Sequence, residues 1–152
     1  MNLKTKKLFP AYPSTFTGPR AVRIATALFL MLVIVRSCIH LFSSDGGANS
    51  IAGIDVTVAG GDNIIAIFHQ WGAIQLILAV LLSVLFIRYP GFTPLVLLTL
   101  AMDPIMRAIA GQMKPVTSEG TPPGESLNWP SFILIGLLFI FSFIEKREER
   151  TQ

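Results

Sequence analysis

The chain has 152 residues, of which 52% are hydrophobic and 14% are charged, and its formal net charge is +3. A soluble domain is nearer a quarter charged, so this composition argues against a small soluble protein. The apolar residues form long blocks flanked by the cations, which argues against a nucleic-acid-binding face and indicates a membrane protein. The single cysteine, Cys38, excludes an internal disulfide and a cysteine-based metal cluster.

The first residues predict a short leader followed by a transmembrane helix. Residues 1–19 are polar and broken by Pro10, Pro13 and Pro19, so we expect a leader without a packed core of its own. The first apolar block covers about residues 21–42. At roughly 20 residues it exceeds the apolar region of a cleaved signal peptide, and no small-residue cleavage motif ends it. We therefore expect an uncleaved first span.

Two further apolar blocks follow a glycine-rich loop. Within the loop, residues 43–63, the alternation of apolar and polar side chains at 54–58 permits a short strand at the membrane surface. The second block, about residues 64–87, is long enough to cross ~30 Å of hydrocarbon. A tight turn at 88–91 leads into a third block at about residues 92–110.

The last apolar block follows a second polar loop. Residues 111–129 are rich in proline and glycine, and the block itself covers about residues 130–144. Trp129 suits a membrane interface, and Pro130 suits the first turn of a helix. Residues 145–152 form a charged tail.

The distribution of the cations predicts how the chain crosses the membrane. One side would hold nine of them: Lys4, Lys6, Lys7, Arg20, Arg23, Arg88, Lys146, Arg147 and Arg150. The opposite loops hold only Lys114. By the positive-inside rule, we expect both termini in the cytoplasm and a multi-pass protein of the bacterial inner membrane. Residues 20–144 are then predicted to form an all-α, antiparallel four-helix transmembrane bundle with two outer Gly/Pro-rich loops.

Polar side chains inside the predicted spans are the main functional clue, because a charge near the bilayer centre costs at least ~2.5–3.5 kcal/mol. All of the ionisable ones and one deep amide fall in the outer half of the bilayer: Arg36, His40, His69, Gln75, Asp103 and Arg107. Asp103 and Arg107 are four residues apart and can pair on one helix face. Pro104 favours a kink there, and Gly72 leaves room for a neighbouring helix.

Structural and functional interpretations of these residues both remain open. The Asp103–Arg107 pair can serve only to neutralise buried charge, while Arg36 and His40 can extend to the outer interface. A functional interpretation assigns ligand binding to Arg36, His69, Gln75, Asp103 and Arg107. His69 is then the best catalytic candidate, because its ordinary pKa lies near neutrality. No supporting ligand stands at suitable spacing from either histidine, so no metal or haem is predicted.

The order of these features resembles that of a known group of proteins. A long outer loop, the segment 63–78 (NIIAIFHQWGAIQLIL), a short basic turn and a span with a late arginine resemble the DoxX-like group of small four-helix bacterial membrane proteins. The resemblance covers roughly residues 21–144. It implies a compact bundle that often acts as an accessory or partner subunit. That group often has an acidic residue where Gln75 stands here, so a redox role is not carried over.

Three functions follow as hypotheses. The first is an accessory subunit or assembly factor of a larger membrane complex, because the sequence lacks phosphate-binding, hydrolase and dinucleotide motifs. The second is a membrane-embedded enzyme or a binder of a lipid, quinone or other apolar small molecule, using a polar pocket in the outer half. The third is an oligomeric channel or transporter. No cofactor is predicted beyond such a bound lipid or quinone, and the expected partners are the bilayer, other membrane proteins or further copies of the chain, with no nucleic acid.

Overall fold

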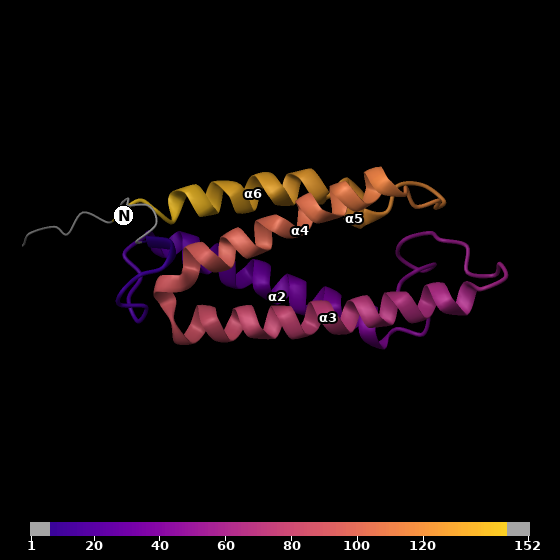
Figure 1. Cartoon of the computed structure of the whole chain (residues 1–152), viewed down its shortest axis with the longest axis horizontal. Helices are drawn as coiled ribbons and strands as arrows, with labels where there is room; N and C mark the ends of the chain where they lie inside the picture. The colour runs from indigo at the N-terminus through magenta and orange to yellow at the C-terminus, as the bar shows by residue number, and fades with distance from the viewer. Residues whose placement is uncertain (1–6, 146–152) are drawn as a thin grey trace, which may run out of the picture.

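The computed structural model describes residues 7–145, and the regular structure in that part of the chain is entirely helical. Its elements are α2 (Arg20–Phe42), α3 (Gly61–Arg88), the 3-10 helix η1 (Pro90–Phe92), α4 (Thr93–Met113), α5 (Pro123–Ser126) and α6 (Asn128–Phe141). The four longer helices lie lengthwise beside one another, with α5 at the start of α6 (Figure 1). The prediction of an all-helical fold is confirmed.

Three helical stretches are long and apolar enough to cross a membrane: α2, α3 and Pro90–Met113. The last helix, α6, has 14 residues and is therefore about 21 Å long at 1.5 Å per residue. It begins before Pro130 and ends before residue 144, where the sequence predicted its end. The helix closes in a turn because the Ser142 amide bonds the carbonyls of Leu138 and Phe139, and the Ser142 hydroxyl also donates to Phe139 O.

The main packing joins α2 to α3 and α4 to α6, with sparser contacts between these two pairs. Small side chains line the α2–α3 contact: Thr26, Ser37, Gly72 and Ala79 are buried. A Cβ added to Gly72 would lie 2.7 Å from the backbone nitrogen of Leu41. The prediction that Gly72 gives room to a neighbouring helix is confirmed, since the two backbones approach at this residue.

A shared apolar core ties the two pairs together. It contains nine buried side chains from α2, α3, α4 and α6: Val22, Leu30, Leu82, Phe86, Val96, Leu97, Leu100, Ala101 and Ile135. Lipid tails are as apolar as these side chains, so the core stabilises the fold through van der Waals contact more than through removal of water. The helices are thus packed most completely away from the two polar loops.

One arginine and the leader fasten the turn between α3 and α4. The Arg23 guanidinium lies 4.2 Å from the centroid of the Phe86 ring and donates to Phe86 O and Thr93 Oγ1 at 3.3 and 3.2 Å. From the leader, Pro13 O accepts the Gly91 amide at 2.8 Å. The described part of the leader therefore packs across the helix ends, although the sequence indicated no core for it.

The strand permitted at residues 54–58 is wrong, because this segment has no regular structure. Side chains satisfy its backbone instead of a partner strand: Asn49 Nδ2 donates to Ile54 O at 3.1 Å, and Asp55 Oδ1 accepts the Thr57 amide at 2.8 Å. Local side-chain bonds of this kind compete with sheet formation.

Asp45 organises the turn that opens the same loop. Its carboxylate accepts the amides of Gly47, Asn49 and Ser50 at 2.8, 3.1 and 2.7 Å. The Ser50 amide, followed by the other donors, lowers the pKa of Asp45 from 3.8 to about 2. Gly46 and Gly47 adopt φ values of 61° and 76°, which residues with a side chain rarely reach. The turn is therefore fixed by one carboxylate and two glycines.

We expect Gly72→Ala to destabilise the fold, because its Cβ would meet the α2 backbone at His40 and Leu41. Overpacking of this kind costs about 1–3 kcal/mol. The matched control is Gly136→Ala in α6, where a Cβ would meet nothing within 4 Å. That change should stabilise by about 0.5–1 kcal/mol, as glycine-to-alanine changes in helices usually do. Unfolding in mixed micelles, followed by circular dichroism, measures both; equal stability of the two variants contradicts the close approach.

Asp45 should titrate well below an ordinary aspartate. Because its pKa falls from 3.8 to about 2 on folding, the ionised side chain stabilises the loop above about pH 3.8. That stabilisation is lost as the pH falls from there through about 2. Carboxyl NMR of protein carrying ¹³C-labelled aspartate should show this midpoint. Ser50→Ala, which removes a bonded hydroxyl, should raise the midpoint, whereas Ser44→Ala should leave it in place. A midpoint near 3.8 in the unaltered chain contradicts the turn.

Candidate functional site

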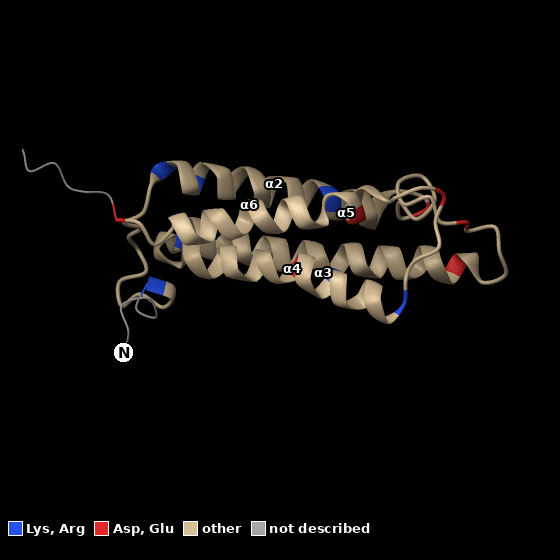
Figure 2. Cartoon of the chain, turned by 90° about the horizontal axis from the view of Figure 1, so that it is seen from above, with Lys and Arg blue, Asp and Glu red and all other residues tan. Residues whose placement is uncertain are grey.

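Three of the five predicted ligand-binding residues meet where α2, α4 and α5 come together. Arg107 Nη2 lies 3.0 Å from Asp103 Oδ2, and Arg107 Nη1 donates to Gly124 O at 3.1 Å. The Arg36 guanidinium lies over the Trp71 ring, 4.8 Å from its centroid. We call these five residues the outer basic cluster. Basic and acidic patches lie together beside α5, within otherwise uncharged stretches of helix (Figure 2).

Gly124 brings the two arginines of the cluster into one place. A Cβ built on Gly124 would lie 3.4 Å from Arg107 Nη1 and 3.8 Å from Arg36 Nη2. Both guanidiniums therefore face the same backbone position from different helices. Trp71 and Gly124 were not among the predicted site residues. Trp71 lies four residues before Gln75, so the sequence placed both on one helix face. No sequence signal connects Gly124 with arginines on α2 and α4.

The cluster has two guanidiniums but only one carboxylate, which pairs with Arg107. The side chains of Arg107 and Asp103 are 27% and 43% exposed, and the pair spans one helical turn. Among the described residues, Arg36 takes part in neither of the ion pairs and in none of the side-chain hydrogen bonds. Arg107 Nε is buried without a partner. The cluster thus combines two positive charges with one negative charge and keeps a formal surplus of one positive charge.

Pro104 lies beside the ion pair, and its carbonyl is the point at which Asn128 of α6 bonds to α4. Proline has no amide proton, so it cannot donate to the preceding turn. The helix α4 nevertheless continues through Pro104 to Met113. The buried Asn128 side chain donates to Pro104 O at 2.9 Å, which fastens the start of α6 to α4. This contact holds the two helices together beside the cluster.

Gln75 lies in the α2–α3 contact rather than among the arginines. It is 9% exposed, and its Oε1 accepts a long hydrogen bond of 3.5 Å from the Ser37 hydroxyl. That hydroxyl also donates to Val33 O at 2.7 Å, so its main bond is within α2. Trp71 precedes Gln75 by four residues, which places the amide about 6 Å deeper than the cluster along α3. Gln75 therefore supports the helix contact next to the cluster.

His69, the predicted catalytic candidate, is directed away from the cluster. Its Nδ1 lies 2.9 Å from Leu41 O, near the end of α2. It lies two positions before Trp71, so the two side chains differ by about 200° around the helix axis. Since a carbonyl only accepts, Nδ1 carries the proton in this contact. His69 thus joins α3 to the end of α2, on another flank from the arginines.

His40 is a structural residue at the outer end of α2. Its side chain is 5% exposed, and Nδ1 lies 2.7 Å from Gly46 O. The ring stacks on Trp71 with a centroid distance of 4.6 Å. The interpretation in which His40 extends to the outer interface is therefore wrong, because the ring is enclosed between the loop and Trp71. Within residues 7–145, no group of three or more His, Cys, Asp or Glu side chains forms a candidate metal site.

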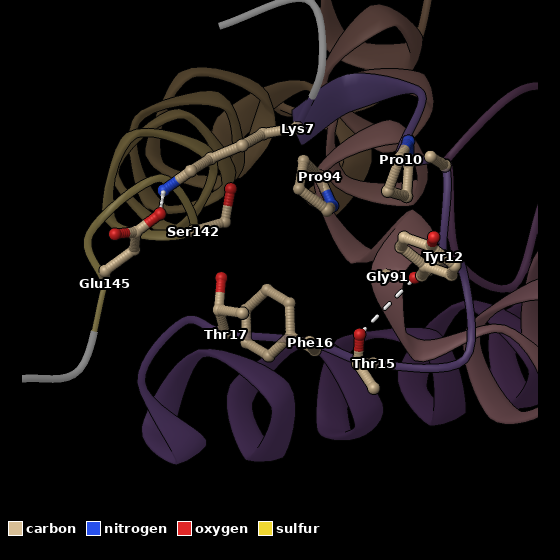
Figure 3. A pocket seen from close by; sticks show the side chains of 11 residues that line it. Lys7, Pro10, Tyr12, Thr15, Phe16, Thr17, Gly91, Pro94, Ser142 and Glu145 are labelled. Atoms are coloured by element: carbon tan, nitrogen blue, oxygen red, sulfur yellow. Dashed lines mark hydrogen bonds and ion pairs between the residues drawn. The ribbon is translucent and has the colours of Figure 1, made fainter. Parts of the chain in front are cut away.

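A cavity of about 230 Å³ lies at the opposite end of the helices (Figure 3). The leader, the start of α4 and the residues after α6 line it, and Phe16 and Thr17 stand opposite Pro94 in the view. Lys7 closes one side, since its Nζ lies 2.9 Å from Glu145 Oε1 and donates to Phe143 O at 2.8 Å.

A second, open concavity of about 510 Å³, which we call the apolar groove, lies along one face of α2 towards its C-terminal end, and no other helix lines it. Its lining residues are Ile34, Val35, Cys38, Ile39, Phe42 and Ser43. Neither this groove nor the cavity beside Lys7 is lined by any of the five predicted ligand-binding residues. The predicted outer polar pocket therefore coincides with neither of these two concavities, and its residues are divided between the cluster and the α2–α3 contact.

Comparison of the chain with protein-family models, with curated proteins and with solved structures gave no match.

Proposed function

We propose that this chain is a small accessory or assembly subunit that binds another membrane protein within the bacterial inner membrane. The observation that carries the proposal is the apolar groove on α2. The outer polar side chains support it, because both histidines bond backbone carbonyls of their own chain and Arg107 bonds the loop at Gly124. These residues hold the fold together, and the lateral apolar surface is left to interact with other molecules.

The groove suits a transmembrane helix of a partner protein. Its walls include the branched side chains Ile34, Val35 and Ile39, whose χ1 angles are already restricted in a helix. Such walls lose little side-chain entropy when a partner packs against them. Association between membrane helices depends on van der Waals fit, so an exposed apolar helix face of this kind favours packing against a partner helix.

The proposed topology has four spans and both termini in the cytoplasm. The cation distribution supports it by the positive-inside rule. The described parts of the leader and of the segment after α6 also lie at the same end of the helices, where Lys7 bonds Phe143 O (Figure 1). An even number of crossings brings both ends of a chain to one side. Trp129, which is 56% exposed at the start of α6, would anchor that helix at the outer interface.

The side on which the C-terminus lies tests whether α6 crosses the membrane. A green fluorescent protein fused after Gln152 should fluoresce, and alkaline phosphatase fused at the same place should be inactive, because phosphatase requires export. Thr121→Cys in a Cys38→Ser background should react with an impermeant maleimide added to intact spheroplasts. An active C-terminal phosphatase contradicts the fourth crossing, since only an odd number of spans exports that end.

Site-specific photocrosslinking tests the groove. A benzophenone amino acid replacing Cys38 should form an adduct of one defined mass in native membranes, and the captured protein should co-purify with the unmodified chain. The matched control replaces Ile74, which is 68% exposed on α3 at a similar depth. Val35→Trp should fill the groove and reduce co-purification about tenfold, which corresponds to 1.4 kcal/mol. Adducts with lipid alone at Cys38, or equal protein capture from Ile74, contradict the proposal.

A second candidate function is favoured by the positive surplus of the outer basic cluster: binding of a lipid or another amphiphilic small molecule near the outer surface. Polar groups that converge beside an apolar region are the usual arrangement of a ligand site. Membership of the DoxX-like group and an oligomeric channel stay predictions.

A further inference from the structure

The outer basic cluster contains a positive charge that the described chain does not neutralise. Arg107 pairs with Asp103, whereas the contact recorded for the Arg36 guanidinium is the face of Trp71. Glu125 follows Gly124 directly, yet it is exposed and joins neither ion pair of the described residues. A guanidinium in a partly apolar setting is costly unless an anion or hydrogen-bond acceptors compensate it. The cluster therefore keeps a positive charge that an anion from outside the described chain can neutralise.

The depth of the two arginines places this charge near the outer surface of the bilayer. Arg36 and Arg107 each precede the last residue of their helix, Phe42 and Met113, by six residues. At 1.5 Å per residue, each lies about 9 Å from the helix end. Headgroups add roughly 5–8 Å on each side of the hydrocarbon, and arginine side chains reach toward them. In the proposed topology both guanidiniums stand at the boundary between acyl chains and headgroups.

The geometry leaves donors available for a ligand. The Arg36 guanidinium lies over the Trp71 ring, and none of its N–H groups makes a hydrogen bond within the described residues, so these donors can bond a ligand. Gly124 has no side chain to stand between Arg36 Nη2 and Arg107 Nη1, the two atoms nearest to its built Cβ. Planar guanidiniums bind carboxylate and phosphate oxygens through paired hydrogen bonds.

We propose that Arg36 and Arg107 together bind the phosphate or carboxylate of an amphiphilic molecule in the outer leaflet. The inference rests on the second candidate function and names its ligand as an oxyanion. Asp103 orients Arg107 and limits the surplus to one positive charge, so a monoanionic headgroup neutralises the cluster. A neutral quinone would leave the surplus charge uncompensated. Phosphate on a lipid and free phosphate share this chemistry, and the experiment must separate them.

Native mass spectrometry of the full chain from nanodiscs tests the proposal. Discs of phosphatidylcholine with a minor fraction of phosphatidylglycerol should yield the chain with one retained phosphatidylglycerol. Arg36→Gln and Arg107→Gln should each lower that retention about tenfold, because each removes a charge-assisted hydrogen-bond donor. The matched control is Arg23→Gln, which changes an arginine stacked on Phe86 at the other end of the helices and should leave retention unchanged. Circular dichroism and gel filtration confirm that each variant is folded.

Asp103→Asn separates binding from a purely structural role. It raises the formal surplus from one to two positive charges, so phosphatidylglycerol retention should rise several-fold even if the fold loses stability. Equal retention by the unaltered chain and both arginine variants overturns the inference, as does a loss with Arg23→Gln as large as with Arg36→Gln. Inorganic phosphate should not displace phosphatidylglycerol from the chain in the mixed discs. In pure phosphatidylcholine discs it should not shift Trp71 fluorescence in a Trp129→Phe background. A response at low phosphate concentration overturns the assignment to a lipid.

Two further measurements, quinone retention and protein capture at Cys38, distinguish this inference from the two proposed functions. Retention of a neutral quinone that is unchanged by Arg36→Gln overturns the oxyanion inference and leaves the second candidate function in place. Loss of phosphatidylglycerol with Arg36→Gln, without loss of the protein captured at Cys38, supports the lipid site independently of the accessory role.

Discussion

Polar groups at membrane depth must find their partners within the protein, and this requirement shapes most of the contacts described here. Four hydroxyl side chains inside the helices donate to the carbonyl four residues earlier: Thr26, Ser37, Ser83 and Thr99. The larger polar side chains reach further, since His40 bonds the first loop, His69 the end of α2, and Asn128 the Pro104 carbonyl. These longer bonds connect one element with another. Arg36 and Arg107 depart from this rule, because Arg36 contacts a ring face and Arg107 Nε is buried without a partner.

The same requirement explains why the long helices and the ion pair within α4 could be predicted from the sequence. A long apolar block in lipid must be helical, so the bounds of α2, α3 and α4 lie within a few residues of the predicted spans. The Asp103–Arg107 contact depends only on helical spacing and was accessible for the same reason. The last helix ends at Phe141, and this differs from the predicted end of its span as little as the bounds of α3 and α4 differ from theirs.

Contacts between distant elements were not accessible in this way. The alternation at residues 54–58 suggested a strand, but the backbone bonds of this loop go to Asn49 and Asp55 side chains and, at Gly53 O, to the Glu119 amide of the second loop. Sequence placed Arg36 and His69 in one outer layer, yet a common depth says nothing about angular position. His69 and Trp71 have different angular positions around the α3 axis. Only the packing of α2 on α3 decides which of the two side chains lies beside the arginines.

The two proposed activities occupy different faces of one helix. Arg36 and Cys38 are two positions apart on α2, so they differ by about 200° around its axis. Arg36 faces Trp71 and Gly124, whereas Cys38 lines the apolar groove. A partner helix in the groove therefore leaves the basic cluster free to hold a headgroup. Ser37 and His40 contact Gln75 and Trp71 of α3, and these contacts hold α2 in the orientation that directs Arg36 to the cluster and Cys38 to the groove. The two proposed sites therefore share one helix without sharing a face.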